Sequence, residues 1–282
     1  MKFNIKPAGL KLFIIIIPVI VITVIVTLAI NLYYLEEVTM FRTDRCVSLT
    51  PKNLKIHYED AYFRTNDGEI INGWFIPAEN ARITVLYCPG STGNLNDRFR
   101  EIIFFHEMGL NLLTFDYRGY GKSSGRPREE GLYRDARAAY DFLVSMPGVD
   151  KDNIVVYGRS LGGAVAADLC LWRKARALIL QSSFVSFETE ARDLYPFLPV
   201  GFLLYGRFDT LAKIRNVRIP KLIVHGADDE VVSCDQAELL YKLAPSPKQF
   251  ISYDGNHDDD VFVTSNEYKN DIEKFFRDNK IF

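Results

Sequence analysis

The feature that most constrains the fold is a serine between two glycines, placed between a strand-like run and a helix-like run. The pentapeptide GRSLG at 158–162 follows the apolar run Ile154–Tyr157 and precedes the small residues at 163–167. This order needs a sharp strand-to-helix turn, with glycines where a side chain would collide with a neighbouring strand or helix. The serine hydroxyl is then exposed on a strained backbone, so Ser160 is predicted to be a catalytic nucleophile. The alternative is a glycine-rich turn in an inactive relative of such enzymes.

A serine nucleophile needs a base, and a carboxylate that orients the base. In the usual setting of this motif the chain order is serine, acid, histidine. The predicted strand Leu222–His225 is followed by three adjacent acids, Asp228–Glu230, and a later strand, Gln249–Tyr253, is followed by His257. Both lie at C-terminal strand ends, where open α/β sheets place their sites. His257 is therefore the predicted base, and spacing alone does not choose among the acids.

The chemistry also needs two backbone N–H donors for the oxyanion of a tetrahedral intermediate. One is expected from Leu161, the residue after the nucleophile. The other is expected from the loop after the predicted strand Ile83–Cys88, which reads PGSTGN at 89–94. Its glycines permit close approach of the backbone to a substrate, and the amide of Ser91 is the predicted donor.

After residue 55 the chain alternates short apolar runs with longer helix-like segments. This alternation predicts an α/β fold with a mostly parallel sheet flanked by helices. A β-hairpin comes first, with strands Ala61–Thr65 and Glu69–Ile76 around an Asn-Asp-Gly turn. The later predicted strands are Ile83–Cys88, Leu110–Phe115, Ile154–Tyr157, Ala177–Gln181, Leu222–His225 and Gln249–Tyr253, and the predicted helices lie near Arg98–Met108, Gly131–Val144, Gly162–Lys174, Gln236–Ala244 and Asn266–Asn279. No linker divides these elements, so 55–282 is predicted to be one domain.

A different kind of segment precedes this domain. Residues 12–32 form an uncharged run of 21 residues, sixteen of them Leu, Ile, Val or Phe. As a helix the run would be roughly 31 Å long, which matches the hydrocarbon core of a bilayer. We predict a transmembrane helix at 12–34, between an N-terminal segment 1–11 and a connector 35–54. A buried core helix is disfavoured because the run has no polar face, whereas a signal peptide cleaved near Ala29 stays open.

The charges that flank the run predict its orientation. Lys2, Lys6 and Lys11 precede it without any acid, whereas Glu36 and Glu37 follow it. Basic flanks tend to stay in the cytoplasm. We therefore expect a single-pass membrane protein with a cytoplasmic N-terminus and with the catalytic domain on the opposite side of the bilayer.

Charge and spacing exclude several other functions. The net charge of −2 carries no electrostatic footprint for nucleic acid, so no nucleic-acid partner is expected. The four cysteines lack metal-ligand spacing, which argues against a structural zinc and leaves a disulfide open. The GKS tripeptide at 121–123 fails as a phosphate-binding loop, because Asp116 stands where that motif needs glycine. With Asp258–Asp260 taken as a solvated loop, we predict no metal and no cofactor.

Two further stretches carry a family likeness. FDYRGYGKS at 115–123 and GLYRDA at 131–136 are expected to build a turn and a helix start. With them, the chain from about Tyr62 onward resembles the α/β-hydrolase superfamily, and within it the BEM46-like or ABHD13/ABHD17-like membrane-anchored serine hydrolases. That group's H-G-x-x-D motif falls on Asp229 and its D-G-x-H motif falls on His257. The resemblance therefore implies that Asp229 is the acid of the triad.

One departure from that group concerns the oxyanion loop, which usually reads H-G-N-x-G-N. Here Pro89 and Ser91 replace the histidine and the asparagine. The segment 182–209, rich in Phe, Tyr, Leu and Pro, stands where such hydrolases commonly carry a lid. It is expected to be either a short lid over an acyl substrate or a helix that completes the core.

Together these observations predict a membrane-anchored serine hydrolase that cleaves carboxylic ester or thioester bonds through an acyl-enzyme. Its expected partners are a small-molecule or lipid acyl substrate and the bilayer. Two alternatives stay open. One is an amidase or peptidase of the same fold, because a triad does not choose the leaving group, and the other is a non-enzymatic membrane-tethered binding module that retains the fold.

Overall fold

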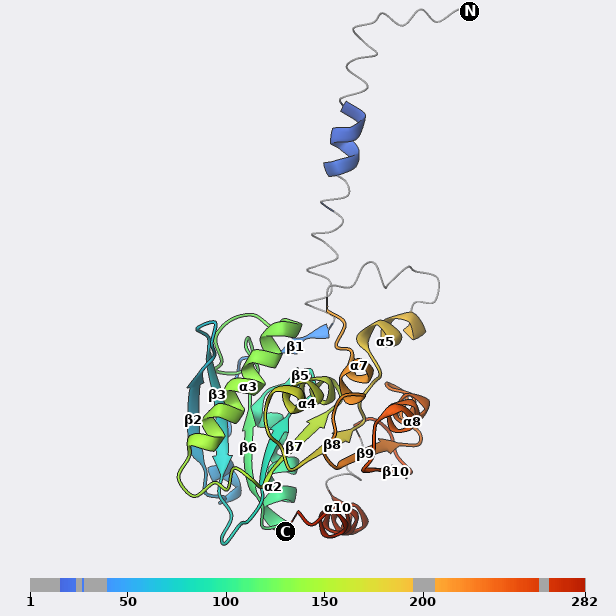
Figure 1. Cartoon of the computed structure of the whole chain (residues 1–282). Helices are drawn as coiled ribbons and strands as arrows, with labels where there is room; N and C mark the ends of the chain where they lie inside the picture. The colour runs from blue at the N-terminus through green and yellow to red at the C-terminus, as the bar shows by residue number, and fades with distance from the viewer. Residues whose placement is uncertain (1–15, 24–26, 28–39, 195–205, 259–263, 282) are drawn as a thin grey trace, which may run out of the picture.

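The computed structural model describes residues 16–23, 27, 40–194, 206–258 and 264–281. Its centre is an eight-stranded sheet with the spatial order β10-β9-β8-β7-β4-β6-β3-β2 (Figure 1). The strands are β2 Glu59–Arg64, β3 Ile70–Ile76, β4 Thr84–Cys88, β6 Asn111–Phe115, β7 Ile154–Arg159, β8 Ala177–Gln181, β9 Lys221–Gly226 and β10 Lys248–Tyr253. The strands from β10 to β6 run parallel, whereas β3 is antiparallel to both β6 and β2.

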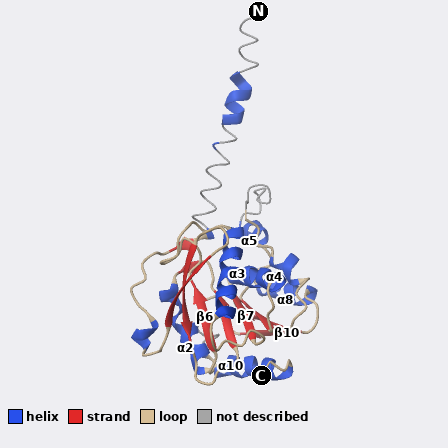
Figure 2. Ribbon diagram, turned by 60° about the vertical axis from the view of Figure 1, so that its left-hand side comes forward, coloured by secondary structure: helices blue, strands red, loops and turns tan. Residues whose placement is uncertain are grey.

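Helices cover both faces of the sheet (Figure 2). The helices are α2 Phe99–Glu107, α3 Glu129–Ser145, α4 Leu161–Trp172, α5 Phe187–Leu194, α7 Thr210–Ile214, α8 Cys234–Leu243 and α10 Asn266–Asp278. One hydrophobic core joins the sheet to α3, α4, α7 and α8, and a second joins it to α2 and α10. Because successive side chains of a strand point to opposite faces, Leu86 of β4 enters the first core while Val85 and Tyr87 enter the second.

The predicted α/β architecture is therefore confirmed. Every strand predicted after residue 55 forms within one or two residues of its expected ends, and the predicted hairpin forms as β2 and β3. The sequence did not predict the two-residue strands β1, Arg42–Thr43, and β5, Thr92–Gly93, or the short 3-10 turns Pro51–Leu54 and Leu95–Arg98. Segments this short carry no hydrophobic period, so a pattern search cannot find them.

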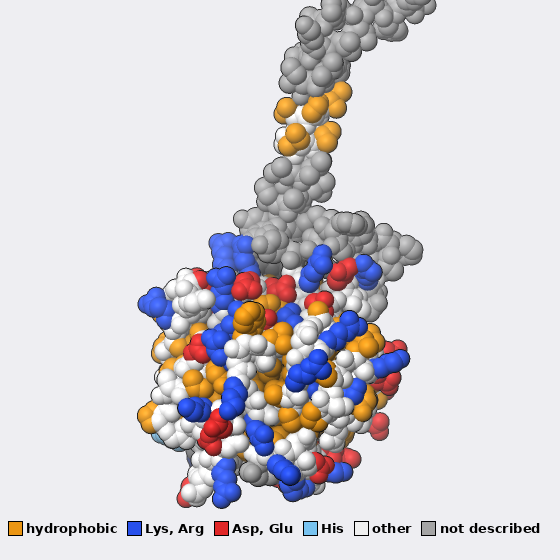
Figure 3. All heavy atoms as spheres, viewed as in Figure 1, with side chains coloured by type: hydrophobic (Ala, Val, Ile, Leu, Met, Phe, Trp, Pro, Cys, Tyr) orange, Lys and Arg blue, Asp and Glu red, His pale blue; other side chains and the backbone are white. Residues whose placement is uncertain are grey.

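The predicted transmembrane helix 12–34 lies largely outside the described residues. Residues 16–23 within it are helical, and the apolar side chains of residues 16, 17 and 19–22 are exposed, as the orange atoms above the body show (Figure 3). Among the residues that the structure describes, no helix is both long enough and apolar enough to cross a bilayer. The membrane anchor and its orientation stay predictions.

The last part of the predicted connector is packed against the domain. Met40 and Phe41 are buried, and the ring of Phe41 meets that of Phe208 edge to face at 6.1 Å between centroids. The next two residues form β1, which pairs in parallel with β5. The segment from Met40 onward is therefore part of the folded body.

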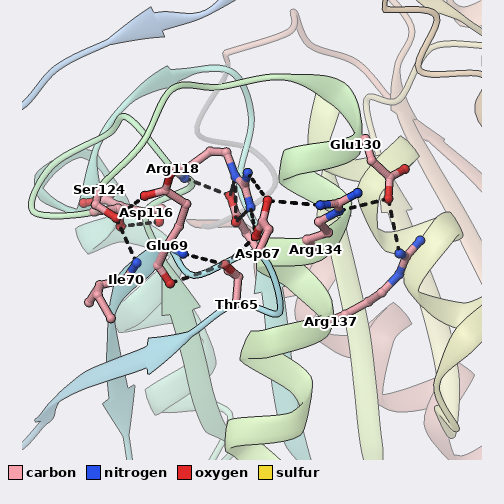
Figure 4. Close-up of polar contacts among 12 residues, drawn as sticks. Thr65, Asp67, Glu69, Ile70, Asp116, Arg118, Ser124, Glu130, Arg134 and Arg137 are labelled. Carbon is pink, nitrogen blue, oxygen red and sulfur yellow. Dashed lines mark hydrogen bonds and ion pairs between the residues drawn. The ribbon is translucent and has the colours of Figure 1, made fainter.

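The two motif stretches meet in an ion-pair network centred on the buried side chain of Arg118 (Figure 4). Arg118 donates to Asp135 of α3 at 2.8 Å and to Asp67 of the hairpin turn at 2.9 Å. Hydrogen bonds from Arg118 hold the pKa of Asp67 well below its usual range. Arg118 thus ties the loop after β6 to the β2–β3 turn and to α3. The sequence predicted only that these stretches build a turn and a helix start, so the link through Arg118 is an addition from the structure.

Candidate active site

The order of the strands creates the site. After β4 the chain builds β6 on one side, and it then returns to the other side to add β7, β8, β9 and β10. The strands β4 and β7 are consequently neighbours whose onward connections diverge, which is the switch point where open α/β sheets bind ligands. Cys88 at the end of β4 pairs with Gly158 of β7. The loop after β4 and the turn at Ser160 therefore emerge side by side.

The turn at Ser160 has the strained backbone that the motif predicted. Ser160 adopts φ 52° and ψ −122°, a conformation that L residues rarely occupy and that costs about 1–3 kcal/mol. A Cβ at Gly162 would lie 2.0 Å from the carbonyl oxygen of Cys88, and one at Gly158 would lie 2.3 Å from that of Gly162. Both glycines are thus required where β4, β7 and α4 converge.

The structure brings the three residues implied by the resemblance together. His257 Nε2 lies 3.2 Å from Ser160 Oγ, and His257 Nδ1 lies 2.7 Å from Asp229 Oδ2. Asp229 and His257 are buried, whereas Ser160 is partly exposed. A hydroxyl open to a substrate thus lies next to an imidazole that a buried carboxylate holds, the arrangement needed for a Ser-His-acid relay.

Among the three adjacent acids, only the middle one faces the histidine. Asp228 and Glu230 are exposed, whereas Asp229 is buried. The second oxygen of its carboxylate accepts N–H bonds from Val231 and Val232 at 2.9 and 2.8 Å. Burial alone would raise the pKa of Asp229, but hydrogen bonds from its histidine neighbours and from Val232 hold that pKa well below its usual range. The carboxylate therefore stays ionised when it faces His257.

The sequence assigned no role to His225, which the structure places against the acid. His225 is fully buried at the end of β9, with Nε2 lying 2.8 Å from the carbonyl oxygen of Val232 and 3.2 Å from Asp229 Oδ2. A carbonyl can only accept, so Nε2 carries the proton. The only hint of this role in the sequence was that His225 begins the H-G-x-x-D motif. The role became clear only when the structure placed His225 next to Asp229.

Arg159, which directly precedes the candidate nucleophile, was also missed. Its guanidinium donates to the carbonyl of His257 at 3.1 Å and to the carboxylate of Asp258 at 2.8 Å. On its other side it lies 3.7 Å from Glu101 of α2. Arg159 therefore connects the turn at Ser160 to the backbone that carries His257.

The two predicted oxyanion donors belong to segments that meet at Ser160. Leu161 is the first residue of α4, so its N–H belongs to the first turn, which has no partner within the helix and carries the positive end of the dipole. A Cβ built on Gly90 would lie 3.6 Å from Ser160 Cβ, which places the backbone just before Ser91 in contact range of the candidate nucleophile. The site thus brings together a candidate nucleophile, a candidate base and the electropositive start of α4.

The predicted lid 182–209 is described at its two ends. Phe184, Val185 and Phe208 are buried, and Phe187 N–H donates to the Arg207 carbonyl at 2.8 Å. These ends pack into the core, which agrees with the second of the two expectations for this segment. Residues 195–205, on which a lid would depend, lie outside the described residues.

Within the described part of the chain, no group of three or more His, Cys, Asp or Glu side chains is arranged to hold a metal ion. Asp258 is described, whereas Asp259 and Asp260 are not. The question of a disulfide was left open by the sequence. In this structure all four cysteines, Cys46, Cys88, Cys170 and Cys234, are free thiols.

Comparison with known proteins agrees with this architecture. A family model described as the alpha/beta hydrolase fold matches residues 83–207. Protein YfhR of Salmonella typhimurium is 35% identical over 268 residues, which cover 88% of this chain and 88% of that protein. Protein bem46 of Schizosaccharomyces pombe is 34% identical over 214 residues, covering 71% of this chain and 70% of that protein.

Solved structures share the fold at lower sequence identity. An esterase of Pyrococcus furiosus superimposes with a TM-score of 0.70 at 22% identity, covering 85% of this chain and 98% of that one. An acetyl xylan esterase from Paenibacillus sp. R4 gives a TM-score of 0.64 at 19% identity, covering 89% and 92%. At these identities the likeness establishes the fold alone.

Proposed function

Because the chain belongs to the BEM46-like α/β hydrolases, we propose that it is a serine hydrolase that cleaves carboxylic ester or thioester bonds. The observation that carries the proposal is the continuous contact from Ser160 Oγ through His257 to the ionised Asp229. A partly exposed serine on a strained turn has no structural need for such partners. A nucleophile that must lose a proton does need them.

The reaction follows from this geometry. Ser160 Oγ attacks the acyl carbonyl while His257 Nε2 takes the hydroxyl proton, and Asp229 stabilises the resulting imidazolium. The N–H groups of Leu161 and Ser91 stabilise the oxyanion. Collapse of the intermediate expels the alcohol or thiol with the proton from His257 and leaves an acyl-Ser160 ester. Water, activated by His257, attacks this ester, so that the acid is released and the serine is restored.

The proposal places the enzyme at a membrane. The apolar run 12–32, its basic flank and the acids after it support a single-pass anchor with a cytoplasmic N-terminus and the catalytic domain on the opposite side. Met40 is buried in the domain, so the anchor would join the body within a few residues. A lipid acyl substrate at the bilayer surface would suit this placement. A small-molecule acyl ester is the other substrate class of the proposal.

A panel of leaving groups tests the function. The full chain in detergent is assayed on p-nitrophenyl butyrate, a butyryl thioester and a butyryl p-nitroanilide. We expect ester or thioester turnover that Ser160→Ala lowers at least about 10³-fold. Ser145→Ala, on the exposed end of α3, is the matched control and should retain the wild-type rate.

The other outcomes identify the alternatives. Turnover of the anilide alone would replace the ester assignment with an amidase. A wild-type protein that turns over none of the three would support the non-enzymatic binding module instead. Equal ester turnover by wild type and Ser160→Ala would show that the activity arises elsewhere.

A further inference from the structure

The oxyanion loop, Pro89–Gly93, is held by hydrogen-bond donors that lie outside the loop. The hydroxyl of Tyr117 donates to the Pro89 carbonyl at 3.1 Å, and that of Tyr120 donates to the Ser91 carbonyl at 2.7 Å. The Ser91 carbonyl also accepts the backbone N–H of Arg42 at 3.2 Å. The guanidinium of Arg98 donates to the Thr92 carbonyl. Each donor thus fixes the direction of one loop carbonyl.

These contacts fix two peptide planes in particular. In a trans peptide the carbonyl and the N–H point in opposite directions, and the unit is planar. The Pro89 carbonyl belongs to the peptide just before the Gly90–Ser91 peptide, and the Ser91 carbonyl belongs to the peptide just after it. Because both flanking planes are held, the peptide that carries the Ser91 N–H keeps its place, and it can turn only if ψ of Gly90 and φ of Ser91 change together in opposite senses.

The donors themselves are firmly placed. Tyr117 and Tyr120 are 1% and 2% exposed, and burial raises the pKa of Tyr120, so its phenol stays protonated and donates. Arg42 lies in β1, directly after the buried pair Met40 and Phe41. The Ser91 carbonyl thus joins the loop after β6 to the strand that follows the predicted anchor.

We propose that Tyr120 and the backbone amide of Arg42 are positioning groups for the oxyanion hole, acting through the Ser91 carbonyl. The inference rests on the proposed serine hydrolase function. It assigns a catalytic purpose to two regions for which the sequence suggested none: the FDYRGYGKS stretch and the connector. The hydrolase site would then depend on a strand outside its central sheet.

The test compares isosteric variants of the full chain. Tyr120→Phe removes the hydroxyl and keeps the ring. Tyr140→Phe is the matched control, because Tyr140 is also buried and its hydroxyl donates to a backbone carbonyl, that of Lys174, two residues after the end of α4. Removing an oxyanion donor outright costs about 10²–10³ in kcat, so we expect displacement of one to cost about tenfold.

With p-nitrophenyl butyrate, Tyr120→Phe should lower kcat about tenfold with KM within about twofold, while Tyr140→Phe stays within twofold of wild type. Arg42→Pro, which removes the amide donor, should lower kcat further than Arg42→Ala, which retains it. Amides of residues 90–93 should exchange hydrogen faster in Tyr120→Phe than in Tyr140→Phe. A merely structural tyrosine would move the melting temperature without this separation of kcat from KM.

An active wild type with equal kcat in Tyr120→Phe and Tyr140→Phe would overturn the inference. A wild type that reacts neither with the ester nor with a fluorophosphonate would instead overturn the proposed function. In that case hydrogen exchange still decides the positioning claim: faster exchange at 90–93 supports it, and unchanged exchange overturns it.

Discussion

His225 Nε2 lies 3.2 Å from Asp229 Oδ2, the same carboxylate oxygen that lies 2.7 Å from His257 Nδ1. Because the Val232 carbonyl accepts the proton of Nε2, the same positively polarised N–H also lies against the acid of the candidate triad. The backbone N–H groups of Val231 and Val232 donate to the other oxygen of the same carboxylate. The acid thus has its orientation set from three sides before a substrate arrives.

His225→Leu should therefore lower kcat/KM about tenfold and reduce the free energy of unfolding by about 1–3 kcal/mol, because it leaves buried acceptors without their donor. His225→Gln supplies an amide N–H near the position of Nε2 and should recover part of both losses. Ester hydrolysis and urea denaturation measure the two effects. If His225→Leu has wild-type kcat/KM, the donor has no influence on the triad.

The strained turn at Ser160 predicts opposite effects on activity and stability. Ser160→Gly and Ser160→Ala both remove the nucleophile, yet glycine adopts φ 52° without the penalty that alanine retains. Ser160→Gly should therefore be more stable than Ser160→Ala by about 1 kcal/mol, while both variants are inactive. Urea denaturation midpoints check this, and equal midpoints would mean that the turn stores no strain.

Asp116 predicts a pH dependence of stability. It is 3% exposed, and burial raises the pKa of Asp116 to about 7. From about pH 4 to pH 7 the unfolded chain releases this proton while the folded chain keeps it, so the contribution of Asp116 to the free energy of unfolding falls across that window. Asp116→Asn cannot ionise. Its advantage over wild type should grow from near zero at pH 4 to on the order of 2–4 kcal/mol above pH 7.

Denaturation of the two proteins at pH 4.5 and pH 8 measures this difference. The Asn oxygen can still accept the backbone bond from Leu95 that the carboxylate accepts, which keeps the comparison matched. A constant difference at both pH values would show that Asp116 ionises normally.

The predicted anchor is tested by removing it. The full chain should stay in the membrane pellet after an alkaline carbonate wash, whereas a chain that starts at Met40 should enter the supernatant and keep its ester turnover, because Met40 and β1 are retained. The N-terminal residue of the cellular protein separates anchor from signal peptide. A mature chain that starts near Ile30 would contradict the anchor.

The parts of the fold and site that the sequence predicted are those that local patterns encode. The strand ends before Ser160 and His257 were visible because β-branched runs stop at glycine-containing turns. The choice of Asp229 over Asp228 needed the family motif, because adjacent residues differ only in which way they face. The hydrogen bonds from Tyr120 and Arg42 to the Ser91 carbonyl could not be predicted. These residues are 29 and 49 residues away from Ser91 in the sequence, and only the fold brings them together.

The central claim, that Ser160 is the activated nucleophile, is tested most directly by reaction of the full chain with a fluorophosphonate, followed by mass spectrometry of its peptides. The account predicts one covalent adduct, on Ser160, that disappears in Ser160→Ala and forms far more slowly in His257→Ala. A wild-type chain without an adduct, or with its adduct on another residue, would contradict it.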